Sequence, residues 1–455
     1  MKNKKNILIN IAIKRHLYDL KHRKWKKDRI KKVQEKYLLM RVQIGAKPTY
    51  DRLFNIGLSD NTKYLFENED SPLNFERIKK ISDTYNSIIV IPKIFSLIEN
   101  PKDSYDAIKK IIASLLIHKR QEVIIDYTIC DNFTLEAQVL LDLILKDILC
   151  FYKLCEGINK FKNIPKLITD RSIRGSNIRT MLFSVGSQAI HAKKQQEFAN
   201  VIPYNLRFHR ATSNSLYQIE QKELDTTSLS DYVEKCLDRM GRKLDDESMD
   251  DLCTVIGEIL INAEEHSSTK SRYSIGYFEE KDIDGKHIGF FQLVIMNIGR
   301  TIYEKFHDQD CPNKKIVEKM RILSDKYTKK HFWQRNTFEE ESLWTLYSLQ
   351  DGVTSISPEL YQHRGNGSCR FIESFFNLRT NKDDNGLSKM TLQSGKTNII
   401  FDGKYNTCDR IVNGDKYKVM TFNESGDIED KPDTQYVKTT EYYFPGTFIC
   451  ANIIF

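Results

Sequence analysis

The nine-residue stretch Glu258–His266 constrains this chain more than any other segment. On a helix, Glu258, Asn262 and His266 recur every four residues and form one polar row. The intervening apolar residues can pack inward. A carboxylate and a carboxamide one turn apart suit magnesium and a nucleotide, because the amide oxygen is a hard Mg²⁺ ligand and the carboxylate can orient or deprotonate water. The alternative interpretation is an ordinary amphipathic helix with a polar outer face.

A second segment, Leu293–Ile302, is an apolar run that ends in Asn297-Ile-Gly299-Arg-Thr301. This pattern predicts a strand followed by a turn at Gly299. An ordinary exit from a strand into a turn would explain the same residues. The segment becomes informative only through its position after the Glu258–His266 helix.

A third segment contains Arg364-Gly365-Asn-Gly367-Ser368 ahead of an apolar helical pattern. Two glycines at this position can present backbone amides at a helix N-terminus, which suits a phosphate group. Arg364 could add positive charge there. A surface loop is the alternative interpretation.

In this order, the three segments resemble the ATPase fold shared by gyrase, the heat-shock chaperone of that fold, the mismatch-repair ATPases and histidine kinases (the GHKL fold). The resemblance implies that ATP and Mg²⁺ are the cofactors. It also implies that Glu258 and His266 are catalytic, that Asn262 binds Mg²⁺ and that Asn297 contacts the adenine amino group. Further cofactor contacts are expected from Gly299, Thr301, Arg364, Gly365, Gly367 and Ser368. Asn297 departs from the Asp of the family pattern, and Thr301 departs from its second glycine.

The first half of the chain predicts a small α/β unit. Two apolar, β-branched runs alternate with two stretches of helical spacing, at 87–92, 103–118, 122–126 and 134–152. This order, with Asp126 closing the second strand, resembles the STAS-type domain of anti-sigma-factor antagonists. The loop after Asp126 lacks the Ser that regulated members phosphorylate. The resemblance implies a protein partner for this part of the chain.

Positive charge is concentrated at the start of the chain. Residues 1–50 hold 16 Lys and Arg against three Asp and Glu, a net charge of +13, whereas the remainder nets −5. They predict a basic helical arm, because no Pro or Gly occurs before Gly45. Such an arm could bind nucleic acid or an acidic partner, attract an anionic membrane surface, or pack on the chain's own acidic remainder.

Membrane spans and secretion are not expected. No apolar run reaches the length of a transmembrane helix, and no cleavage site follows the basic start. The nine cysteines include no C-x-x-C pair, which favours reduced thiols and a cytoplasmic location.

The sequence as a whole predicts an α/β protein with four segments. These are a basic helical arm (1–50), a STAS-like α/β domain (51–160), a connector (161–215) and a GHKL-type α/β sandwich (216–455), whose mixed sheet has helices on one face. The last segment is expected to contain a helix at 249–266, helical segments within 303–340, and strands at 271–278, 287–296, 397–401 and 443–455.

The expected function is that of an ATP- and Mg²⁺-binding regulatory protein. It would act as a nucleotide-driven switch or slow ATPase in bacterial signalling, stress response or phage defence. Two alternatives remain open: an anti-sigma-type Ser/Thr protein kinase, and a catalytically inactive scaffold that binds nucleic acid through residues 1–50. Homodimerisation also remains open.

Overall fold

The computed structural model describes residues 57–82, 87–159, 166–168, 176–187, 197–211, 215–328, 338–355, 367–379, 387–412 and 415–455. The predicted basic arm, residues 1–50, lies outside them. The chain divides into two compact units, Met1–Leu58 with Leu149–Ile164, and Ser59–Ile148 with Pro165–Phe455. The second unit holds both a small α/β part and a large sheet. Within the described ranges, no helix has the length and apolar character needed to cross a bilayer.

The small α/β part contains both strands and helices, as the alternation of patterns predicted, and its paired strands are parallel. Three of them pair in the order β1-β3-β5, and β2 pairs with β4. Its strands are β1 (Ile88–Val90), β2 (Ile94–Phe95), β3 (Glu122–Asp126), β4 (Asn132–Phe133) and β5 (Lys166–Ile168). Its helices are α3 (Asp60–Glu67), α4 (Phe75–Lys79), α5 (Pro101–Ile112), the π-helical turn η1 (Ala113–Ile117), α6 (Leu135–Asn159) and α7 (Ser176–Val185). Parallel neighbours require crossover connections, and α5 and α6 lie between successive strands along the chain.

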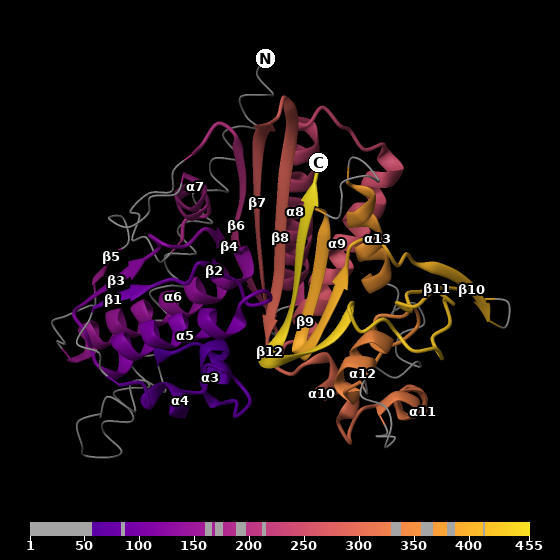
Figure 1. The fold of residues 1–455 in the computed structure, drawn as a ribbon, viewed down its shortest axis with the longest axis horizontal. Helices are drawn as coiled ribbons and strands as arrows, with labels where there is room; N and C mark the ends of the chain where they lie inside the picture. Colours follow the sequence, from indigo (N-terminus) through magenta and orange to yellow (C-terminus); the bar gives the residue numbers. More distant parts are fainter. Residues whose placement is uncertain are drawn as a thin grey trace. The chain divides into compact units, whose positions relative to one another are not determined.

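The large sheet has five strands in the order β6-β7-β8-β12-β9. They are β6 (Val201–Arg210), β7 (Ser271–Ile283), β8 (Lys286–Ile298), β9 (Lys389–Phe401) and β12 (Val437–Ile454). Figure 1 shows β12 running between β8 and β9. All pairings among these described strands are antiparallel, so the expected mixed sheet is wrong here. For β7 and β8 the antiparallel direction follows from the hairpin that joins them, because Asp284 and Gly285 both have positive φ and close a tight turn.

The edge strand β6 lies in the segment that the sequence predicted as a connector. Pro203 lacks a backbone N–H, and the β6–β7 register shifts between Tyr204 and Arg207. Both features are tolerated at a sheet edge. The large sheet therefore begins before residue 216.

Both faces of the large sheet are covered, whereas helices were expected on one face. Side chains alternate between the faces, and one face, with Phe291, Leu293 and Ile295, packs in a core shared with helices α8 (Ser215–Arg239), α9 (Asp246–His266) and α13 (Gly367–Asn377). On the other face, Cys450 Sγ of β12 lies 3.8 Å from Oε2 of the buried Glu136 on α6. This double coverage explains why the first nine residues of β7 are all buried.

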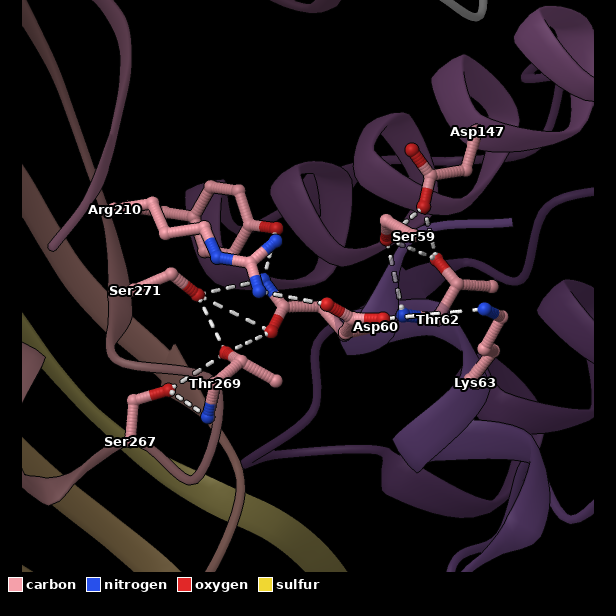
Figure 2. A network of polar contacts seen from close by, with 11 residues as sticks. Ser59, Asp60, Thr62, Lys63, Asp147, Arg210, Ser267, Thr269 and Ser271 are labelled. Carbon is pink, nitrogen blue, oxygen red and sulfur yellow. Dashed lines mark hydrogen bonds and ion pairs between the residues drawn. The ribbon is translucent and has the colours of Figure 1, made fainter. Parts of the chain in front are cut away.

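A polar network joins α3 to the large sheet (Figure 2). The buried Asn61 side chain donates to Ser271 Oγ at 3.0 Å and to Tyr273 OH at 2.5 Å. It also accepts a hydrogen bond from Thr269 Oγ1, in the turn after α9. At the same end of α3, Thr62 Oγ1 donates to Asp147 of α6 at 2.5 Å. The small α/β part is thus fixed to the sheet by buried hydrogen bonds.

The remaining described elements are three helices and a hairpin, and two of the helices contact β9. They are α10 (Ile302–His307), α11 (Lys314–Thr328), α12 (Glu340–Ser348) and the β10–β11 hairpin (Cys408–Val412 and Asp415–Val419). Helices α10 and α11 confirm the helical segments expected within 303–340. The hairpin was not predicted.

Candidate functional site

Helix α9 carries the Glu258–His266 motif, and its existence confirms the helix expected at 249–266. Asp245 caps its start by accepting a hydrogen bond from Ser248 N at 2.8 Å. Its apolar positions, including Ile256, Ile259 and Leu260, are buried in the core. The apolar residues therefore set how the helix rotates on the sheet, and that rotation places the polar row.

A cavity of about 200 Å³ lies between α9, the sheet and the ends of α10, α12 and α13. Each of the three sequence motifs contributes to its wall: Asn262 from α9, Asn297 from β8, and Ser368 from α13. The segment 353–355 also lines it. Segments far apart in the sequence thus meet at one cavity.

Other predicted site residues do not line this cavity. Glu258 is half-buried one turn before Asn262 but is not among the lining residues. Gly367 is the first residue of α13. Arg364, Gly365 and the side chain of His266 lie outside what the structure describes.

Asn297 has hydrogen bonds within the protein as well as a place at the cavity. Its Nδ2 donates to the Ala263 carbonyl of α9 at 2.8 Å, and its Oδ1 accepts from Thr447 N of β12 at 3.0 Å. An amide oxygen has two lone pairs, so Oδ1 can accept one more hydrogen bond. The residue therefore holds α9 to the sheet at the cavity wall.

Gly299 and Thr301 have local structural roles. Gly299 has a φ of 147°, and a Cβ there would clash with the backbone nitrogen of Ser268. Thr301 caps α10: its hydroxyl accepts from Glu304 N at 3.1 Å, and Thr301 N donates to Glu304 Oε2 at 2.7 Å. Neither residue lines the cavity. The turn after β8 and the start of α10 account for both residue types.

Lys305 is a cavity residue that the sequence motifs did not indicate. Its Nζ donates to the Glu265 carbonyl, in the last turn of α9, at 2.8 Å. Burial, and then the nearby Arg300 guanidinium, lower the pKa of Lys305 to about 7, while the Glu265 carboxylate acts in the opposite direction. No local pattern points to this lysine, because it lies in a polar helical stretch with many other charged residues.

A buried ion-pair cluster fixes the end of α9 nearest the cavity. Glu264 pairs with Lys222 of α8 at 3.4 Å and bonds to His209 of β6. Arg272 of β7 pairs with Asp225 of α8 at 2.9 Å, and both side chains are almost fully buried. Removing one partner from such a pair strands a buried charge, so the cluster holds α8, α9 and the sheet together.

The described residues could hold Mg²⁺ only together with a bound phosphate and water, because they supply too few ligands by themselves. Within the described ranges, no group of three or more His, Cys, Asp and Glu is arranged to hold a metal ion. Magnesium usually takes one or two protein oxygens and completes its shell with water and substrate phosphates. Asn262, at the cavity wall, can supply one such oxygen.

Compared with protein-family profiles, curated proteins and solved structures, the chain has no significant match.

Proposed function

We propose that the large sheet and its helices bind ATP with Mg²⁺ in the cavity beside α9, and that binding acts as a conformational switch. The observation that carries this proposal is the meeting of Asn262, Asn297 and Ser368 at one cavity. These residues come from three separate segments of the chain. This convergence supports one shared site over three unrelated structural segments.

The residues have distinct roles in this proposal. Asn262 would offer its amide oxygen to Mg²⁺, which would neutralise phosphate charge. Asn297 would accept a hydrogen bond from the adenine amino group through its second lone pair. Ser368, in the first turn of α13, would approach the phosphates together with backbone N–H groups of that turn.

The size of the cavity favours a switch. Small-molecule pockets usually measure about 300–1,000 Å³, whereas this one is about 200 Å³. A nucleotide held entirely within it would need a wider cavity, which movement of α9, α10 or α13 could supply. Because Ala263 and Thr447 are tied through Asn297, movement of α9 would be transmitted to the sheet.

Rapid hydrolysis has less support than binding. A general base must reach its proton within hydrogen-bond distance, and Glu258 does not line the cavity. Glu258 would have to come closer when the nucleotide binds. We therefore propose nucleotide binding as the primary activity and slow hydrolysis as its consequence.

The test is calorimetric titration of the full chain with ATP, with and without Mg²⁺, for the wild type and Asn262→Ala. The matched control is Thr254→Ala, an exposed position on the same helix. We expect the control to match the wild type, and Asn262→Ala to lose at least about tenfold in affinity and most of its Mg²⁺ dependence, which is ~1.4 kcal/mol or more. Absence of ATP binding by the wild type, or identical binding by Asn262→Ala, would refute the proposal.

A second measurement identifies the fate of the γ-phosphate. With γ-labelled ATP, slow release of inorganic phosphate would agree with the switch. Transfer of label to protein would instead identify the kinase alternative.

A further inference from the structure

Lys305 stands out among the charged groups at the cavity. Among the described lining residues, it is the only cation, and Glu265 is the only anion. Both are at helix ends: Lys305 in the last turn of α10, and Glu265 in the last turn of α9. The hydrogen bond from Lys305 Nζ to the Glu265 carbonyl holds the ammonium group beside α9.

The placement of Lys305 is built into the local fold. The Thr301–Glu304 capping box fixes the start of α10. Ile302 N donates to Ser394 Oγ of β9 at 3.0 Å, and Tyr443 OH of β12 donates to Glu304 Oε1 at 2.8 Å. A short helix tied to two strands in this way presents Lys305 at a defined point of the wall.

A half-buried ammonium at a cavity is costly, and the Glu265 carboxylate offsets only part of that cost, because the pKa of Lys305 is still lowered. The lowered pKa of Lys305 expresses the same cost, with burial as its largest cause. A polyphosphate is the anion that a compact ammonium point charge suits, and its charge would offset the desolvation. Adenine and ribose carry no charge and would gain nothing from it.

We propose that Lys305 is a specificity-determining residue that pairs with the terminal phosphates of the nucleotide and so makes the site prefer triphosphates to the nucleoside. This inference rests on the proposed function, because it concerns the same cavity. Asn262 would act through Mg²⁺, whereas Lys305 would contact phosphate oxygens directly. The two residues would therefore respond differently to removal of the metal.

The experiment measures affinities of the full chain for adenosine, AMP, ADP and ATP in three variants. Lys305→Met keeps side-chain length without charge, Lys305→Arg keeps the charge, and Lys315→Met, at an exposed position of α11, is the matched control. We expect Lys305→Met to lower the affinity for ATP about 10- to 100-fold and to change the affinity for adenosine by no more than about twofold. Lys305→Arg should retain most of the preference for ATP, and Lys315→Met should match the wild type.

The outcomes separate this inference from the proposed function. The inference fails, and the nucleotide site stands, if the wild type binds ATP but Lys305→Met lowers the affinities for ATP and adenosine equally. The same holds if Lys305→Met changes neither affinity. If the wild type binds none of the four ligands, both fail. Thermal melts of each variant establish folding, and Lys305→Gln replaces Lys305→Met if the latter unfolds. In the absence of Mg²⁺, the charge effect of Lys305 should persist; its disappearance would assign the effect to the metal and overturn the inference.

Discussion

Replacing Glu341 with Gln should stabilise the protein at alkaline pH and leave it unchanged at acidic pH. Glu341 lies in the first turn of α12, where its Oε1 accepts a hydrogen bond from Lys396 N at 2.7 Å. Burial is the main cause that raises its pKa from 4.5 to about 7; the Lys396 hydrogen bond opposes the rise, and Glu304 and Asp70 add to it. The folded state therefore binds more protons than the unfolded chain between these two values.

The sign and size follow from this difference. The stability that protonated Glu341 contributes is fully present below pH 4.5 and is lost as the pH rises to about 7. At ~1.4 kcal/mol per pKa unit, the loss has a ceiling of roughly 3 kcal/mol, and solvent screening of a half-buried carboxyl reduces it to about 1–2 kcal/mol. Gln keeps an oxygen for Lys396 N but does not ionise.

Urea unfolding at pH 4.5, 6 and 8 measures this effect. We expect the free energy of unfolding of Glu341→Gln to equal that of the wild type at the lowest pH and to exceed it by about 1–2 kcal/mol at pH 8. Glu339→Gln, an exposed position two residues earlier, is the control and should follow the wild type throughout. Parallel pH profiles for Glu341→Gln and the wild type would refute the reasoning.

Three further substitutions test other parts of the fold by thermal or urea unfolding. Gly299→Ala should cost about 2–4 kcal/mol, because it combines a positive φ with a clash at Ser268 N; a loss under ~0.5 kcal/mol would contradict this. Asn61→Ala should cost about 2–4 kcal/mol, because it removes the group that links α3 to β7; faster hydrogen exchange at the start of β7 would locate the damage. Arg272→Met should cost about 3–5 kcal/mol by stranding the buried Asp225 carboxylate, and adding Asp225→Leu should recover much of the loss; strictly additive losses would show that the pair is not coupled.

Strong local periodicity made much of the fold predictable. Helix α9 and the strands β7 and β8 were expected from their apolar patterns and from the turn at Asp284–Gly285. These elements have many buried apolar residues at regular spacing, so local pattern and tertiary packing agree. Their existence could be predicted without any knowledge of their neighbours.

The edge of the large sheet could not be found in the same way. Strand β6 includes Pro203 and two exposed arginines, Arg207 and Arg210, which locally favour a connector. It is a strand because β7 offers a free edge that is distant in sequence. The mixed sheet was expected from the family resemblance, whereas the tight turn at Asp284–Gly285 accounts for the antiparallel pairing of β7 with β8.

In the candidate site, too, some residues could be expected from local sequence patterns and others depend on tertiary packing. Asn262, Asn297 and Ser368 were expected at one place, and all three line the cavity. Gly299 and Thr301 were given ligand roles, although Thr301-Ile-Tyr-Glu304 also matches a capping box in the sequence. Lys305 had no local signal at all, because its position depends on how α10 is held by β9 and β12.

The large sheet links the cavity to the small α/β part because its strands are covered on both faces. On β12, Thr447 and Ile449 line the cavity, while the adjacent Cys450 lies against Glu136 of α6. A shift of β12 that enlarged the cavity would therefore also move a side chain in contact with a buried carboxylate, whose pKa is raised by burial. The turn after α9 is in the same situation, because Ser268 packs on Gly299 and Thr269 bonds to Asn61. If a ligand binds beside α9 as proposed, it would act on elements that also hold the small α/β part, so we expect the two parts of this unit to respond together.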